Sequence, residues 1–103
     1  MKLSRLAQGT LVAGLILVQS GCGGAHDIDG AALAMEKGCV ACHGVDGKAI
    51  APIYPNLNGQ WERYLRVQLH SYRDNKRQNA VMNGMAANLT DEDIAILAAH
   101  YGD

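Results

Sequence analysis

The chain has 103 residues, of which 49% are hydrophobic and 18% charged, and its formal net charge is −1. This length suits one small domain, and the composition is too apolar and too weakly charged for a disordered tail. The near-neutral charge argues against nucleic acid as the main partner. Because a chain this short buries only a modest core, we expect an additional stabilising element such as a disulfide, a metal or a cofactor.

The first 21 residues have the features of an export signal. Lys2 and Arg5 supply positive charge, and an uncharged apolar run follows from Leu11 to Val18. The run is shorter than the roughly 20 residues that a transmembrane helix needs. We therefore expect residues 1–21 to be a signal peptide and the protein to be exported to the periplasm or cell envelope.

Cys22 lies between a Ser-Gly pair and a Gly-Gly-Ala sequence. This arrangement resembles the lipidation site of bacterial lipoproteins, although Gln19 stands where that pattern prefers an aliphatic residue. Lipidation of Cys22 would tether the protein to a membrane, whereas cleavage after Ala25 would remove Cys22. With Cys22 retained, residues 22–28 form a flexible linker, and in both cases we expect residues 29–103 to be the folded domain.

The first predicted helix covers residues 29–42. Asp29 is a suitable N-cap, and apolar side chains return at helical spacing through Ala32 and Met35 to Cys39. We expect this face, Met35 included, to lie in the core. The segment that follows, residues 44–58, is rich in Gly and Pro and is predicted to be a long loop that packs around something.

Two further helices and one short helix complete an all-α prediction. Apolar and aromatic side chains recur three or four residues apart over residues 59–74, and a short helix is expected at about 80–83, ended by Gly84. Thr90 is an N-cap, and Asp93 completes a variant capping box at the start of the last helix. No alternation typical of a strand is present, so we expect no sheet.

The sequence Cys39-Val40-Ala41-Cys42-His43 is the motif that indicates chemistry. Two cysteines at this spacing can each add across one vinyl group of a haem, and the adjacent histidine is then directed at the iron. Export agrees with this interpretation, because such haems are attached in the compartment outside the inner membrane.

Three alternatives for the motif are weaker. A zinc site would need two more ligands, for which His70 and His100 are the candidates. A thioredoxin-like pair would follow a strand, and none is predicted. A structural disulfide between the two cysteines would close a very small ring.

From His26 to its end, the chain resembles the class I c-type cytochromes, particularly the short bacterial periplasmic kind typified by one half of the dihaem cytochromes c. The resemblance rests on several motifs in the same order, which is far more specific than the haem motif by itself. The matching segments are Cys39-Val40-Ala41-Cys42-His43-Gly44 with Asp46-Gly47, Ala51-Pro52-Ile53-Tyr54-Pro55-Asn56-Leu57 with Gly59-Gln60 and Glu62-Arg63-Tyr64-Leu65, and Met82-Asn83-Gly84-Met85-Ala86-Ala87-Asn88-Leu89-Thr90-Asp91-Glu92-Asp93-Ile94.

The resemblance implies an all-α class I cytochrome c fold around one covalently attached haem c. It implies thioether bonds at Cys39 and Cys42, with His43 and Met82 as the axial ligands of the haem iron. Met82 rather than Met85 corresponds to the ligand of the family.

Other positions follow from the same resemblance. Pro52 matches the proline whose carbonyl accepts a hydrogen bond from the proximal histidine. Ala32 stands where the family commonly has Gly, which predicts a looser or slightly rotated crossing of the first and last helices. We also expect a group of side chains near the haem, namely Tyr54, Asn56, Trp61, Arg63 and Tyr64.

The function implied is that of an electron carrier rather than an enzyme, because both axial positions of the iron are filled. Its partners would be other redox proteins, which the sequence does not name. A haem-bearing subunit of a dehydrogenase or oxidase complex is the alternative within the same chemistry. A haem-based sensor would need a weak distal ligand, and a zinc module would be colourless.

Overall fold

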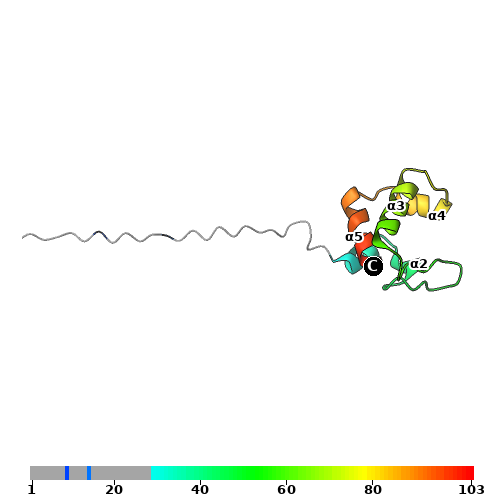
Figure 1. The fold of residues 1–103 in the computed structure, drawn as a ribbon, viewed down its shortest axis with the longest axis horizontal. Coiled ribbons are helices and arrows are strands. Elements are labelled where there is room, and N and C mark those ends of the chain that lie inside the picture. The colour runs from blue at the N-terminus through cyan, green and yellow to red at the C-terminus, as the bar shows by residue number, and fades with distance from the viewer. Residues whose placement is uncertain (1–8, 10–13, 15–28) are drawn as a thin grey trace, which may run out of the picture.

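A computed structural model describes residues 9, 14 and 29–103 of the chain. This part contains five helices and no strand, which confirms the all-α prediction (Figure 1). The helices are α1 (Gly30–Glu36), α2 (Val40–His43), α3 (Glu62–Arg73), α4 (Ala80–Ala86) and α5 (Asp91–Tyr101). Apart from Gly9 and Gly14, the predicted signal peptide, Cys22 and the linker lie outside the described residues. Among the residues described, no helix has the length and apolarity needed to cross a membrane.

The core forms where α5 packs against both α1 and α3, while α4 packs against α3. Ile94 and Leu97 of α5 are at its centre, with 0% and 1% of their surfaces exposed. Burying a side chain of this size contributes about 1.5–3 kcal/mol. The other buried apolar residues are Leu33, Ala34, Leu65, Ala86, Leu89, Ala98 and Tyr101.

The first predicted helix is two helices in the structure. Asp29 caps α1 as expected, with its side chain accepting a hydrogen bond from Ala31 N at 3.0 Å. The predicted face is wrong, however, because Leu33 and Ala34 are buried while Met35 is 67% exposed. Gly38 adopts a left-handed φ of 84°, which ends the first helical segment and changes its phase before α2.

Ala32 is not the residue at which the first and last helices approach each other closely. The close approach of α1 and α5 occurs at Gly30, where a Cβ atom would lie only 2.6 Å from the Cβ of His100. Ala32 is exposed, so a methyl group there does not separate the helices. The glycine that permits the crossing is present two residues earlier than the family pattern suggested.

The last two helices differ in how well they were predicted. The capping box of α5 is confirmed: Thr90 Oγ1 accepts from Asp93 N at 3.0 Å, and Asp93 Oδ2 accepts from Thr90 N at 3.1 Å. By contrast, α4 does not end at Gly84 but continues to Ala86, which is fully buried. The burial of this last turn outweighs the weak helix propensity of a single glycine.

Candidate cofactor site

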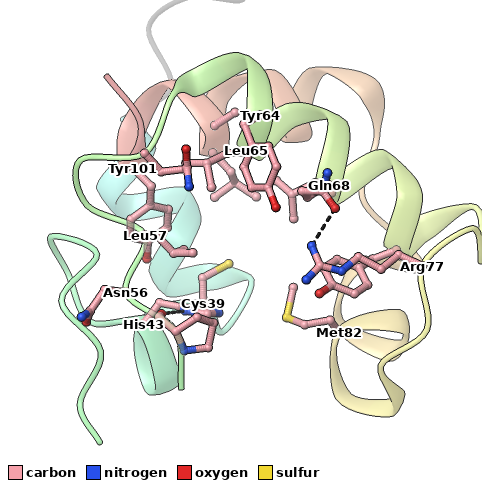
Figure 2. A pocket seen from close by; sticks show the side chains of 16 residues that line it. Cys39, His43, Asn56, Leu57, Tyr64, Leu65, Gln68, Arg77, Met82 and Tyr101 are labelled. Atoms are coloured by element: carbon pink, nitrogen blue, oxygen red, sulfur yellow. Dashed lines mark hydrogen bonds between the residues drawn. The ribbon is translucent and has the colours of Figure 1, made fainter. Parts of the chain in front are cut away.

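Two adjoining cavities of about 250 and 300 Å³ lie between the short helix α2 and helix α4. Figure 2 shows the first of them, with Cys39 and His43 on one side and Met82 on the other. Both cavities are enclosed mainly by apolar surface. They share five lining residues, which are Cys39, His43, Pro55, Tyr72 and Met82.

His43 is the one polar residue among the described positions that is buried in the core, with 8% of its surface exposed. Its Nδ1 lies 2.9 Å from the carbonyl oxygen of Pro55. A carbonyl can only accept, so Nδ1 carries the proton and donates it. This bond directs Nε2 to the cavity side, as the nitrogen available to a metal ion, which is the usual way in which a metal-binding histidine is oriented.

The prediction that Pro52 supplies this carbonyl is wrong. Pro52 is exposed and sits in a turn closed by the hydrogen bond from Tyr54 N to Ala51 O, at 3.1 Å. That turn reverses the chain, so the backbone passes His43 three residues later. Pro55 therefore takes the role that the resemblance assigned to Pro52.

The two cysteines of the motif lie next to the histidine, as their spacing predicts. Both are free and partly buried; Cys39 lines both cavities and Cys42 lines one. Burial raises the pKa of the Cys39 thiol, and the nearby Cys42 raises it further. The sulfur of Cys39 is therefore a neutral thiol at pH 7, placed on the wall of the cavity.

The structure also separates the two methionines. Met82 lines both cavities and points into the space that His43 faces from the other side (Figure 2). Met85 lines one cavity, is 40% exposed, and places its Cε beside Gly38. The geometry therefore favours Met82 as the residue opposite the histidine, while its ligation of iron stays a prediction.

The remaining lining residues of the first cavity come largely from α3 and α5. Of the side chains expected around the haem, Tyr54, Asn56 and Tyr64 do line a cavity. Trp61, which is 75% exposed, and Arg63 line neither. Sequence reasoning missed a polar group at one edge of the first cavity. There Arg77 lies 4.9 Å from the centre of the Tyr72 ring and donates to Gln68 Oε1 at 2.6 Å. The sequence signal that could have identified this group is a basic residue shortly after the predicted helix over residues 59–74.

The ligands that a zinc site would need are elsewhere. His70 Nδ1 lies 3.0 Å from an Arg73 guanidinium nitrogen, and His100 Nε2 lies 2.8 Å from the carbonyl of Val45. Neither histidine lines the cavities. Within the described part of the chain, no three or more His, Cys, Asp or Glu side chains are gathered as a metal site.

Comparison with known proteins agrees with this geometry. The sequence model of a family described as "Cytochrome c" matches residues 28–100. The chain is 54% identical over 55 residues to cytochrome c-554(548) of Halomonas halodenitrificans, covering 50% of this chain and 66% of that protein. It is 47% identical over 51 residues to cytochrome c4 of Pseudomonas aeruginosa, covering 50% of this chain and 25% of the relative.

A third relative carries a more specific name. The chain is 46% identical over 48 residues to the "Thiosulfate dehydrogenase electron acceptor" of Thiomonas intermedia, covering 47% of this chain and 22% of that protein. In all three comparisons the match covers less than two thirds of the relative.

Proposed function

The chain belongs to the cytochrome c family, and on this premise we propose that it carries single electrons between redox proteins of the bacterial cell envelope. Covalently bound haem c is the cofactor of this family. The observation that carries the proposal is the apolar space with His43 on one side and Met82 on the other. We propose these two side chains as the axial ligands of the iron.

The residues around this space fit a haem. The sulfurs of Cys39 and Cys42 lie on its wall for two thioether bonds, and the walls are mainly apolar, as a large hydrophobic ring system requires. His43 donates its Nδ1 proton to Pro55 O, which leaves Nε2 for the iron. When bound, haem supplies an iron centre that alternates between the ferrous and ferric states.

Residues of the protein determine whether the ferrous or the ferric state of this iron is favoured. The Met82 thioether is a soft and neutral donor, which favours ferrous over ferric iron. The apolar walls disfavour the additional positive charge of the ferric form. We therefore expect a raised reduction potential, which suits a carrier that accepts electrons from a donor and delivers them to an oxidase or reductase.

The proposed function is electron transfer without substrate chemistry at the iron. With His43 and Met82 both bound, no coordination position is left for a substrate, so the rate depends on contact with partner proteins. The relative named as an electron acceptor of a dehydrogenase supports a partner of that type. The alternative is a permanent haem-bearing subunit of a dehydrogenase or oxidase complex. The matches that cover only about a quarter of two longer relatives support it, because similar domains occur there within larger chains. This alternative predicts a partner protein that co-purifies.

The axial ligand is tested by replacing each methionine separately in the haem-loaded protein. Met82→Ala is expected to abolish the absorption band near the red end of the spectrum that reports methionine bonded to ferric iron, and to lower the potential. Met85→Ala is the matched control and should leave both largely intact. The opposite result would assign the iron to Met85.

We further propose that Cys22 is lipidated and tethers the domain to a membrane. This rests on the sequence around Cys22, which lies outside the described residues. Cys22→Ser should move the protein from the membrane fraction to the soluble fraction of cells. Unchanged fractionation would contradict lipidation.

A further inference from the structure

Asn83 follows the proposed iron ligand Met82 but does not line either cavity. Its side chain nevertheless uses both its donors and its acceptor. Nδ2 donates to the carbonyl oxygens of Tyr72 and Arg77, both at 2.9 Å. Oδ1 accepts from the backbone N of Asn79 at 2.8 Å. One amide therefore joins α4 to the end of α3 and to the segment between these helices.

The three partners of Asn83 are themselves part of the cavity walls. The side chain of Tyr72 lines both cavities, that of Arg77 lines one, and that of Asn79 lines the other. Asn79 also accepts the backbone N–H of Met82 on its Oδ1, at 3.0 Å. Asn83 therefore binds, on the side away from the cavities, the backbone that carries these cavity-lining side chains.

Apolar burial does little to hold this part of α4. Ala86 is its one buried residue, whereas Val81 is 63% and Met85 40% exposed. The first turn, which carries Met82, depends on the two asparagines: Asn79 caps it, and Asn83 N donates to Asn79 O at 2.7 Å. Without the Asn83 amide, two backbone carbonyls and one backbone N–H lose their side-chain partner.

We propose that Asn83 is a positioning residue that fixes the backbone at Met82 and so determines how firmly the Met82 sulfur holds the haem iron. The proposal rests on the proposed function, because it requires Met82 to be the ligand. Loss of the amide should free the first turn of α4 to move, which weakens the iron–sulfur bond without removing either atom.

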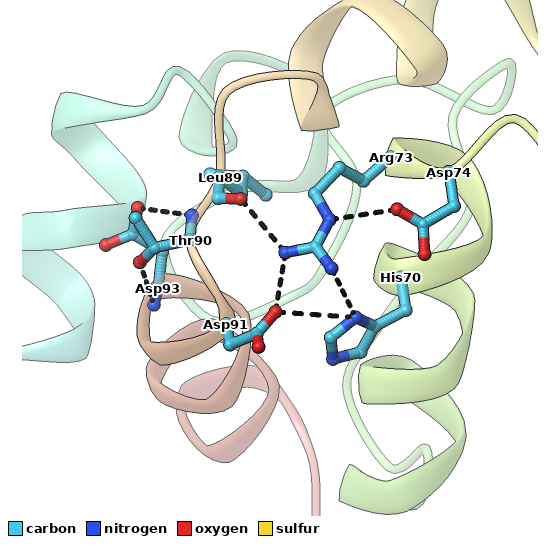
Figure 3. Close-up of polar contacts among 7 residues, drawn as sticks. All are labelled: His70, Arg73, Asp74, Leu89, Thr90, Asp91 and Asp93. Carbon is cyan, nitrogen blue, oxygen red and sulfur yellow. Dashed lines mark hydrogen bonds and ion pairs between the residues drawn. The ribbon is translucent and has the colours of Figure 1, made fainter.

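A second polar cluster at the same end of α3 supplies the matched control (Figure 3). Arg73 Nη1 donates to Leu89 O at 3.2 Å and to Asp91 Oδ1 at 2.7 Å, and Nε donates to Asp74 Oδ1 at 3.2 Å. These bonds join α3 to the start of α5 and make no contact with the first turn of α4. Removing them loosens the fold at the same place but leaves the backbone at Met82 tied.

The test uses haem-loaded protein and the affinity of its ferric form for free imidazole, which competes with methionine for the iron. Asn83→Ala should raise this affinity about tenfold, since loss of two or more hydrogen bonds corresponds to roughly that factor. Asn83→Asp keeps the acceptor for Asn79 N but turns an oxygen toward two carbonyls, so its increase should be at least as large. Arg73→Ala should change the affinity less than about twofold. If Asn83→Ala does not accumulate with haem, Asn83→Ser replaces it in the same measurement.

The outcomes separate this proposal from the one on which it rests. If Asn83 variants and Arg73→Ala raise the imidazole affinity equally, or if Asn83 variants leave it unchanged, the positioning role is overturned. In both cases Met82→Ala would still lose the red absorption band, and the axial ligand would stand. If Met82→Ala keeps the band, the ligand assignment itself fails, and with it the role of Asn83.

Discussion

Helices α1, α3 and α5, called here the frame, differ from the segments that carry the proposed haem ligands, called here the cofactor walls and made of α2, residues 44–61 and α4. The frame contains most of the buried apolar residues, centred on Ile94 and Leu97. The cofactor walls contain His43 and Ala86 as buried side chains, and leave Ile53, at 80%, largely exposed. Most of the protein's own core therefore lies on other helices than those that carry the proposed ligands.

Polar bonds from the frame hold the cofactor walls in place. Tyr101 of α5 donates its hydroxyl to Gly44 O at 3.0 Å, and His100 binds Val45 O at 2.8 Å. Both bonds secure the chain directly after His43. The comparison shows that the frame supplies the burial, whereas the cofactor walls depend on hydrogen bonds and on the group that they enclose.

The largest expected effect is the loss of the haem. Frame residues such as Leu65, Leu97 and Tyr101 also line the cavity, so an unfilled cavity weakens the frame as well as the cofactor walls. The double change of Cys39→Ala and Cys42→Ala should give a colourless and largely unfolded protein by circular dichroism. A well-folded product would show instead that the frame is stable by itself.

Truncation within the frame should have the next largest effect. Leu97→Ala leaves a cavity at a fully buried site, and we expect a loss of about 2–5 kcal/mol in the free energy of unfolding. Val67→Ala on the outer side of α3, where the side chain is 48% exposed, should change it by less than about 0.5 kcal/mol. Denaturant titration of the haem-loaded proteins measures both, and equal losses would contradict the assigned core.

The contact between the frame and the cofactor walls is tested by Tyr101→Phe. Removing the hydrogen bond to Gly44 O should reduce the free energy of unfolding by about 0.5–1.5 kcal/mol. Burial raises the pKa of Tyr101 to about 12. The folded state thus favours the neutral phenol. Its contribution to the free energy of unfolding is complete below pH 10 and falls as the pH rises toward 12.

The free energy of unfolding of Tyr101→Phe should therefore fall less steeply with pH than that of the parent between pH 10 and 12. Stability measured at several alkaline pH values gives this slope. The same slope in both proteins would show that Tyr101 is not the group responsible.

The smallest expected effect concerns the exposed Arg73–Asp91 pair. The hydrogen bond from Arg73 and the charge of Arg73 hold the pKa of Asp91 below its usual range. A lowered pKa stabilises the folded state above the unfolded pKa of about 3.9, and this contribution is lost as the pH falls through the folded value. Asp91→Asn should slightly reduce the fall in stability at acid pH, as measured by thermal unfolding between about pH 2 and pH 5. A steeper acid limb would contradict the pairing.

Much of the site follows from local sequence chemistry. The spacing of Cys39, Cys42 and His43 is set by a single turn of chain, so those residues meet in the structure as predicted. Asp29 and Thr90 cap their helices because the capping bonds reach only two or three residues along the chain. Local bonds of this kind need no knowledge of the rest of the fold.

Tertiary structure decided the features that depend on how distant segments approach one another. Pro55 rather than Pro52 meets His43 because a turn reverses the loop, and Gly30 rather than position 32 meets α5 because the helix phase places it there. Met35 has the spacing of a core residue, yet it is exposed, because a helical period of apolar residues does not specify which neighbour will cover it. The sequence by itself thus determined the helix caps and the haem-binding motif, whereas the packing of distant segments determined which carbonyl meets His43, which glycine meets α5 and whether Met35 is covered.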